Sequence, residues 1–167
     1  MKKKFLLPSS ARGQSLVEMA ISLVILLWLL SGAAEFSIAL FQYIQLRDAA
    51  QEGALYGSLY PTDATGIANR IRGASDTPLD LQDEGAVTVE VFIDDDLTDD
   101  ADPADTVDDI PSTSANYTAS ACEGHGLKII VSYDHHIFMP FMAQILRTDT
   151  IPLVAEVTDT ILTPQCP

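Results

Sequence analysis

A long apolar stretch near the start of the chain, residues 13–46 ("GQSLVEMAISLVILLWLLSGAAEFSIALFQYIQL"), constrains the fold more than any other feature. An uncharged run of 16 residues precedes Glu35, and 11 more uncharged residues follow it before Arg47. At about 1.5 Å per residue, a helix over residues 17–44 would be roughly 42 Å long, which exceeds the ~30 Å hydrocarbon core of a bilayer. The sequence therefore predicts one long, membrane-competent helix.

Two glutamates interrupt this stretch. Glu18 lies at its start and Glu35 within it, and a carboxylate at bilayer depth is costly unless it is paired or neutralised. Glu35 is 17 residues beyond Glu18, about 25 Å along a helix axis and ~100° around it, so one partner cannot serve both. We expect Glu18 either to pair in a helix assembly or to be hydrated at the cytoplasmic interface. Glu35 is expected either in a helix–helix contact or in the outer headgroup region.

Charge is distributed unevenly along the chain. Residues 1–47 hold five Lys/Arg and two Glu, whereas residues 48–167 hold four Lys/Arg and 22 Asp/Glu, giving net charges of +3 and −18. So acidic a domain should repel nucleic acid. The basic residues that precede the helix lie in one short segment without an acid, so the positive-inside rule puts the N-terminus in the cytoplasm. We expect an inner- or plasma-membrane protein with an extracytoplasmic C-terminal domain.

Three regions follow from this pattern: a basic leader (1–13), the long helix (14–60) and a head (61–167). Pro61 is expected to end the long helix. A short second helix is expected over "TDATGIANRIRG", with Thr62 or Asp63 as its cap and Gly73 past its end.

Small residues form two adjacent ridges near the end of the long helix. Ala49, Gly53 and Gly57 recur every four residues, and so does a second set, Ala50, Ala54 and Ser58. Such ridges let another backbone approach closely. They predict a seat for the domain's own sheet or for a neighbouring subunit.

Three segments alternate as strands do: "AVTVEVFID", "LKIIVSYDH" and "TIPLVAEVTDTIL". In each of them one face is apolar by strict alternation, and Pro152 favours the beginning of a strand or a sheet edge. The predicted fold class is therefore α+β, in which a long N-terminal transmembrane helix is followed by a short helix and a small antiparallel sheet packed on the outer part of the long helix.

The two cysteines flank the second and third of these strands. Cys122 precedes one and Cys166 follows the other, so a hairpin centred near Gln144 would bring them opposite each other. An even number of cysteines in an oxidising compartment suggests a disulfide. Closing so long a loop is worth about 4 kcal/mol in the loop-entropy model.

Two segments and the histidines leave alternatives open. Residues 94–109 hold nine Asp without the Gly of a calcium loop, which predicts a solvated acidic loop or a divalent-ion site with no nominated ligands. The apolar hairpin tip "HIFMPFMAQIL", with Phe138, Met139, Phe141 and Met142, either caps the core or lies at a subunit or membrane contact. The three histidines, His125, His135 and His136, are expected to be ordinary surface or edge residues.

Sequence motifs of catalysis are missing. No G-x-S-x-G, P-loop, G-x-G-x-x-G or H-E-x-x-H occurs. The sequence nominates no catalytic residue, metal site or cofactor, and an enzyme is not expected.

The helix and its flanks resemble a known family. A basic leader, Gly13, Glu18 as the fifth residue beyond it and an apolar helix look like the class III signal of type IV pilin-like proteins, cut by prepilin peptidase between Gly13 and Gln14. The segment is further similar to the TadE-like family of tight-adherence (Flp-type) pilus systems. The matching residues are Arg12, Gly13, Glu18, Glu35, Phe36, Ala49, Ala50, Glu52, Gly53, Ala54 and Tyr56.

The resemblance implies a filament subunit or a minor pilin that associates with other pilin-like subunits. It assigns to Glu18 a pairing with the freed N-terminal amine of a neighbouring subunit, which would offset desolvation and fix the stagger between helices. Two alternatives stay open. One is a membrane-anchored extracellular binding domain that could depend on calcium. The other is cleavage by ordinary signal peptidase before Glu35, guided by the small residues Gly32 and Ala34.

Overall fold

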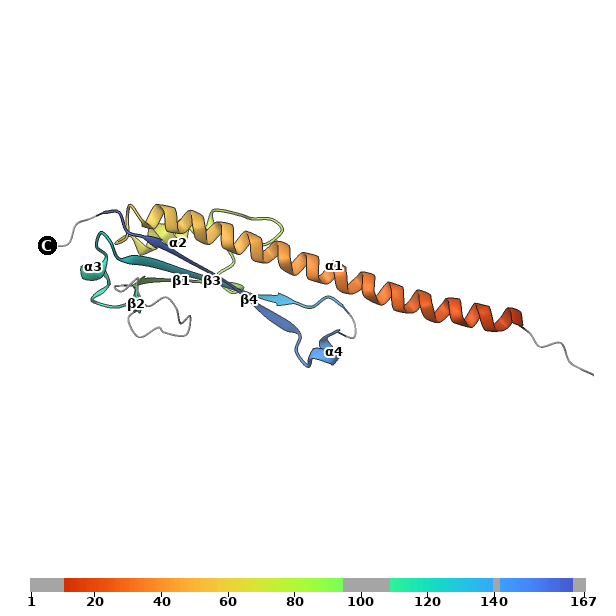
Figure 1. Ribbon diagram of the computed structural model, residues 1–167. Helices are drawn as coiled ribbons and strands as arrows, with labels where there is room; N and C mark the ends of the chain where they lie inside the picture. The colour runs from red at the N-terminus through yellow and green to blue at the C-terminus, as the bar shows by residue number, and fades with distance from the viewer. Residues whose placement is uncertain (1–10, 95–108, 140–141, 164–167) are drawn as a thin grey trace, which may run out of the picture.

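The computed structural model describes residues 11–94, 109–139 and 142–163. One helix, α1 (Ala11–Gly57), runs most of the length of the molecule. Its C-terminal half lies on a small head, and its N-terminal half projects alone (Figure 1). The helix ends a turn earlier than expected from Pro61. Just past the helix, the carbonyl oxygens of Ser58 and Leu59 accept hydrogen bonds from the C-terminal segment, at 2.9 Å from Leu162 N and 2.9 Å from Thr163 Oγ1.

The head contains a four-stranded antiparallel sheet in the order β2-β1-β3-β4, which confirms the α+β class. The three predicted strands are β1 (Val87–Asp94), β3 (Gly126–His136) and β4 (Thr150–Thr160). The sequence pattern missed β2 (Asp109–Pro111) and two short helices, α3 (Tyr117–Ser120) and α4 (Met142–Leu146). Each is only three to five residues long, which is too short for a periodic pattern.

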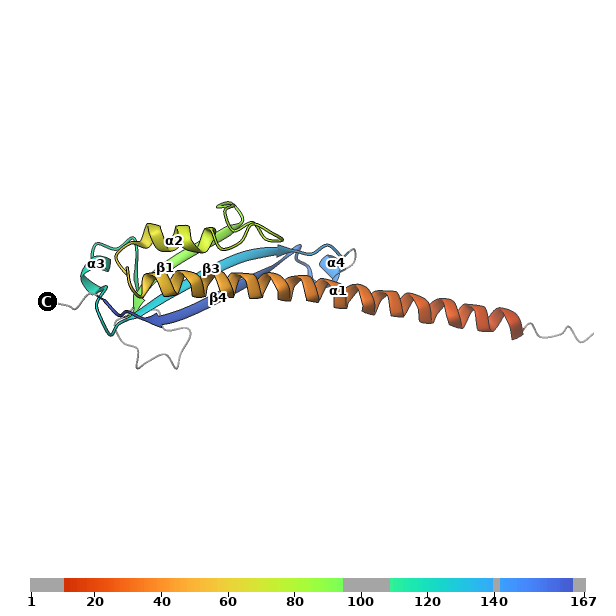
Figure 2. The same cartoon turned by 90° about the horizontal axis from the view of Figure 1, so that it is seen from above.

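The core lies between the sheet and the helices. α1 covers β3 and β4, and α2 (Ala64–Arg72) covers β1 (Figure 2). The apolar faces predicted by alternation point into this layer, with the side chains of Val87, Val91, Ile93, Leu127, Ile129, Val131 and Ala155 buried. Pro152 is the third residue of β4, which is an edge strand, and this agrees with the preference of proline for strand beginnings and sheet edges.

The short helix α2 begins where its cap predicts. Asp63 is the N-cap and accepts a hydrogen bond from Gly66 N at 2.9 Å, while Gly73 follows the last turn. The same carboxylate accepts a hydrogen bond from Tyr56 Oη at 3.0 Å, and this hydrogen bond raises the pKa of Tyr56. Asp63 therefore joins the end of α1 to the start of α2.

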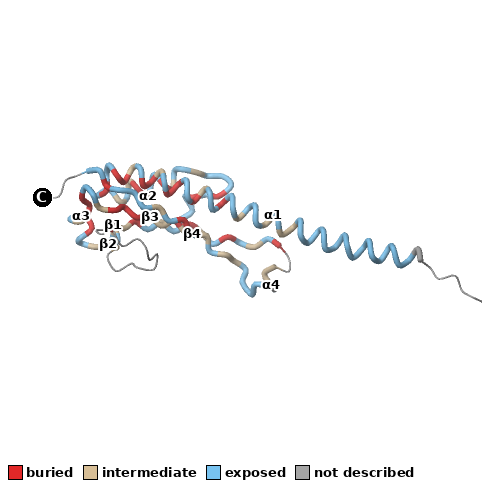
Figure 3. Tube along the Cα trace, viewed as in Figure 1, coloured by how far each residue is buried: buried red, intermediate tan, exposed pale blue. Residues whose placement is uncertain are grey.

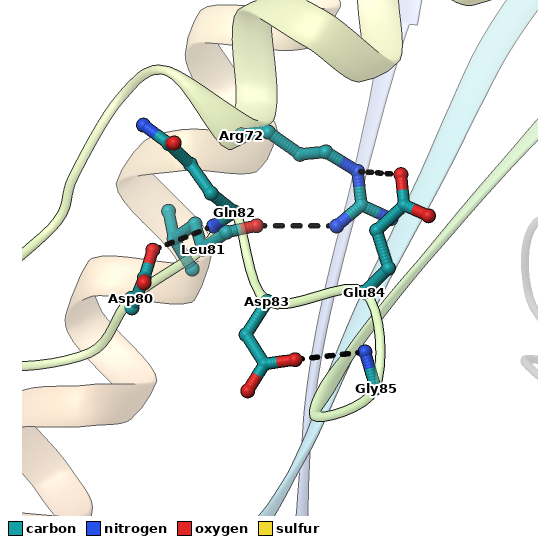
Figure 4. A network of polar contacts seen from close by, with 7 residues as sticks. All are labelled: Arg72, Asp80, Leu81, Gln82, Asp83, Glu84 and Gly85. Carbon is teal, nitrogen blue, oxygen red and sulfur yellow. Dashed lines mark hydrogen bonds and ion pairs between the residues drawn. The ribbon is translucent and has the colours of Figure 1, made fainter.

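The loop after α2 is ordered by polar contacts to its own backbone (Figure 4). Arg72 Nη1 donates to the carbonyl of Leu81 at 3.2 Å, and the side chains of Asp80 and Asp83 accept from the backbone N–H groups two residues ahead of them. These contacts hold the loop so that Leu79 and Leu81 enter the core. This loop thus contributes to the hydrophobic core.

Tyr117 should make the stability of the head depend on pH in the alkaline range. Its hydroxyl donates to the carbonyl of Pro61 at 2.8 Å, and burial raises the pKa of Tyr117 to about 12. An unfolded tyrosine has a pKa of about 10, so between pH 10 and pH 12 the unfolded chain loses a proton that the folded chain keeps. The free energy of unfolding should therefore be unaffected by this group below pH 10 and fall by up to about 3 kcal/mol as the pH approaches 12.

Tyr117→Phe isolates that contribution. Denaturant unfolding of the full-length protein in detergent micelles is expected to show a loss of about 1 kcal/mol at pH 8, from the missing hydrogen bond. Between pH 10 and 12 the variant is expected to lose less stability than the wild type. Identical pH dependences for the two proteins would show that Tyr117 is not the buried titrating group.

Candidate functional site

The projecting half of α1 has no partner within the part of the chain that the structure describes. All residues from 13 to 30 are exposed (Figure 3), and those from 19 to 30 are apolar except for Ser22. α1 is long and apolar enough to cross a membrane, with a mean hydropathy of 2.2 over its most apolar window. An isolated helix that is apolar all round is unfavourable in water, so this half indicates membrane anchoring or burial among other helices.

The residues predicted for processing and assembly lie at the start of this half. Gly13, Gln14 and Glu18 are exposed on the first turns of α1. The Glu18 carboxylate makes no ion pair with any residue that the structure describes. The intramolecular structure therefore leaves Glu18 free for a partner from outside this part of the chain, and its assembly role stays a prediction.

Glu35, in contrast, has partners within the chain. His135 Nε2 lies 2.9 Å from Glu35 Oε1, and His135 Nδ1 lies 2.6 Å from Gln42 Oε1. The His135 side chain is 0% exposed and that of Glu35 is 12% exposed. Both ring nitrogens of His135 are thus in hydrogen-bonding contact, one with the carboxylate of Glu35 and the other with the side-chain amide of Gln42.

The expectation that His135 is a surface or edge residue is wrong. The side chains of Leu127, Ile129, Val131 and Tyr133 alternate toward the core, and His135 continues the same face of β3. Glu35 and Gln42 are seven residues apart, which is two helical turns, so they face the same way. Extending the alternation by two residues places His135 on the core face, although it does not identify Glu35 and Gln42 as its partners, and His136 lies on the opposite, exposed face.

The hairpin tip approaches α1 beside Glu35. Phe138 N donates to Glu35 Oε1 at 3.1 Å, and a Cβ placed on Gly32 would lie 3.6 Å from Met139 Cε. Met139 is buried whereas Phe138 is exposed, and Met142 is half-buried. Phe141 lies outside the described residues. Met139 therefore packs against the chain's own helix as the core-cap alternative predicts, whereas a subunit or membrane contact of Phe138 stays a prediction.

The small residues of α1 lie against the head of the same chain. A Cβ at Gly53 would meet Ile71 and Ile129, and a Cβ at Gly57 would meet Leu127 and Ile67. Ala49 is buried in the same core. Of the two seats considered for these ridges, the structure places them on α2 and β3 rather than leaving them open for a neighbouring subunit.

Of the two cysteines predicted to form a disulfide, the structure describes only Cys122. Cys122 is not a free thiol, and Cys166 lies outside the described residues. The pairing of β3 with β4 sets Gly126 opposite Thr160 and His136 opposite Thr150, so the hairpin is centred at residue 143, one residue before the predicted centre. The Cys122–Cys166 disulfide stays a prediction.

The acidic segment 94–109 begins and ends in paired strands. Asp94 of β1 is opposite Asp109 of β2, and the residues between them lie outside the described part. Asp109 accepts from Lys128 Nζ at 2.9 Å. Burial lowers the pKa of Lys128, but the hydrogen bond and charge of Asp109 outweigh it, so the pKa of Lys128 is raised. Within the described residues no group of three or more His, Cys, Asp or Glu could hold a metal ion.

The fold and the site define a membrane-competent helix whose C-terminal half carries a small antiparallel α+β head. A family model described as TadE-like protein matches residues 13–55, which are nearly the whole of α1, and this confirms the resemblance stated from the sequence. The match indicates a protein associated with the tight-adherence pilus, and the matched family is structural rather than enzymatic. No curated protein and no solved structure matches the chain.

Proposed function

We propose that this protein is a pilin-like subunit or minor pilin of a tight-adherence pilus, and that it assembles through the projecting half of α1. The observation that carries the proposal is the exposed apolar helix with Glu18 at its start, which pairs with none of the described residues, in the segment that matches the TadE-like model. Lipid can cover the apolar surface of such a helix before assembly, and other apolar helices can cover it afterwards. The head, which the positive-inside rule puts outside the cytoplasm, would then form the outer surface.

Processing would create a positively charged partner for the Glu18 carboxylate. Cleavage between Gly13 and Gln14 by prepilin peptidase would leave an amine at the tip of the helix. Within a bundle of apolar helices, that amine on a neighbouring subunit is one of the few cations available to Glu18. Pairing would offset the desolvation of both groups and favour one stagger between neighbours.

The processing step is tested by intact mass and N-terminal peptide mapping of the native protein. We expect a start at Gln14 in the sheared filament fraction. A protein that starts at Met1 and is confined to membranes would favour a tethered binding domain instead. A start near Glu35 in the soluble fraction would overturn the proposal, because the segment that matches the family would have been discarded.

Glu18→Gln tests the pairing itself. The substitution keeps the shape of the side chain and removes its charge, so a buried amine on the neighbour would lose its partner, at a cost of roughly 3 kcal/mol or more. We expect the amount of this subunit in sheared filaments to fall at least tenfold at unchanged membrane level, measured by quantitative immunoblotting. Ser22→Ala, one turn further along the same face, is the matched control and should assemble normally. Wild-type incorporation of Glu18→Gln would contradict the assigned role.

A further inference from the structure

The β3–β4 connection ends level with the middle of α1, far from the rest of the head. Both cartoon views place α4 level with the part of α1 where the helix leaves the head and begins to project, and Figure 1 shows α4 set apart from the helix (Figures 1 and 2). The contact of Met139 with Gly32 and the hydrogen bond from Phe138 N to Glu35 Oε1 fix this level. The Glu35 carboxylate also binds the buried His135, so it connects α1 both to the end of β3 and to the backbone of the tip.

That level coincides with the outer boundary of a bilayer. From Gly13 to Gly32 a helix rises by about 28 Å, close to the ~30 Å thickness of the hydrocarbon core. If the apolar part of α1 begins at the inner boundary near Gly13, then Gly32 reaches the outer boundary and Glu35 the headgroup region. The hairpin tip, which contacts both residues, lies at the same depth.

The chemistry of the tip suits this depth. Phe138 is 72% exposed and Leu146 is 48% exposed, which leaves two large apolar side chains on one short connection. Arg147, which follows directly, is exposed and makes no ion pair within the described residues. The other three cations of the head, Arg70, Arg72 and Lys128, all pair with carboxylates. An aromatic ring, an aliphatic side chain and an arginine are typical of residues at a membrane–water interface.

We propose that the β3–β4 tip is a second membrane contact, in which Phe138 and Leu146 enter the outer leaflet at the boundary of headgroups and acyl chains and Arg147 reaches the lipid phosphates. The occupant is the lipid surface of the bilayer that α1 enters. Continuity argues for lipid, since the tip is fixed to the part of α1 where the membrane ends. The proposal rests on the membrane insertion of α1 and does not depend on the pilus role.

Tryptophan quenching by brominated lipids tests the contact in the full-length protein. The chain has one tryptophan, Trp28, so the Trp28→Phe background allows a single reporter to be introduced at will. Phe138→Trp in this background, reconstituted at high dilution in phosphatidylcholine vesicles brominated near the carbonyl end of the acyl chains, is expected to show blue-shifted and strongly quenched emission. The wild-type indole of Trp28 reports on insertion of α1 and should be quenched by bromine deeper in the chains.

Leu59→Trp in the same background is the matched control, because Leu59 is also an exposed apolar residue but lies at the opposite end of the head, just past the end of α1. Quenching there should be several-fold weaker than at position 138. Equal quenching at the two positions would overturn the proposal. A blue shift at position 138 that bromine does not quench, and that disappears when lipid dilutes the protein, would overturn it in favour of a second copy. An unquenched Trp28 would remove its premise.

Discussion

His135→Leu is expected to lower the free energy of unfolding of the full-length protein in detergent micelles by about 3–5 kcal/mol. Leucine fills roughly the space of the histidine ring but cannot form a hydrogen bond. The Glu35 carboxylate, which is 12% exposed, is then left with only the N–H of Phe138 among the partners described for it. Gln42 Oε1 also loses its hydrogen bond. Leaving a buried polar group without a partner is one of the few mechanisms by which a single substitution causes a large loss of stability.

The neighbouring histidine supplies the control for this experiment. His136 lies on the same strand but is exposed, so His136→Leu is expected to change the unfolding free energy by less than about 0.5 kcal/mol. In the Glu35→Gln background His135→Leu should cost at least about 1 kcal/mol less than in the wild type, because no buried carboxylate is left behind. Equal losses for the two histidine variants would show that the Glu35–His135–Gln42 contact does not stabilise the head.

Gly53→Val is expected to destabilise the same protein by about 2–3 kcal/mol. A Cβ at Gly53 would lie 2.7 Å from Ile71 Cδ1 and would also crowd Ile71 Cγ1, so the buried Ile71 must shift before any side chain fits. The gain in helix propensity on replacing glycine is below about 1 kcal/mol and cannot compensate. Thermal or denaturant unfolding followed by circular dichroism measures the loss.

Gln51→Val on the exposed face of α1 is the matched control for the glycine variant, because it introduces the same β-branched side chain in the same helix without a steric contact. It should be nearly neutral. If both variants are equally stable as monomers in detergent, the close approach of α1 to α2 and β3 is absent in solution. The small residues would then be available to a neighbouring subunit.

Much of the fold could be predicted because its signals are periodic. The apolar length of α1, the cap at Asp63 and the alternation along β1, β3 and β4 all survive in the structure. The short elements β2, α3 and α4 have no comparable pattern, and they form where longer neighbours hold them. For example, Lys128 of β3 binds Asp109 of β2. Tertiary contacts, not local propensity, determine such elements.

The polar contact at Glu35 could be predicted only in part. The sequence shows that a carboxylate at this position needs a partner, but it does not show that the partner comes from a strand 100 residues later. The prediction of His135 as an ordinary surface or edge residue is wrong because a polar side chain continues the core-facing alternation of β3 beyond Tyr133. The role of Glu18 remains a prediction, since its proposed partner belongs to another subunit.

The continuity of α1 has a consequence for the arrangement of heads. A single helix of 47 residues without an internal proline joins the projecting half to the half that the head covers, and the contacts of Glu35 and Gln42 with His135 prevent the head from turning around it. Rotation of the projecting half about its own axis must therefore swing the head through the same angle. The packing of the projecting helices would then determine how each head is oriented around its helix axis, some tens of ångströms away.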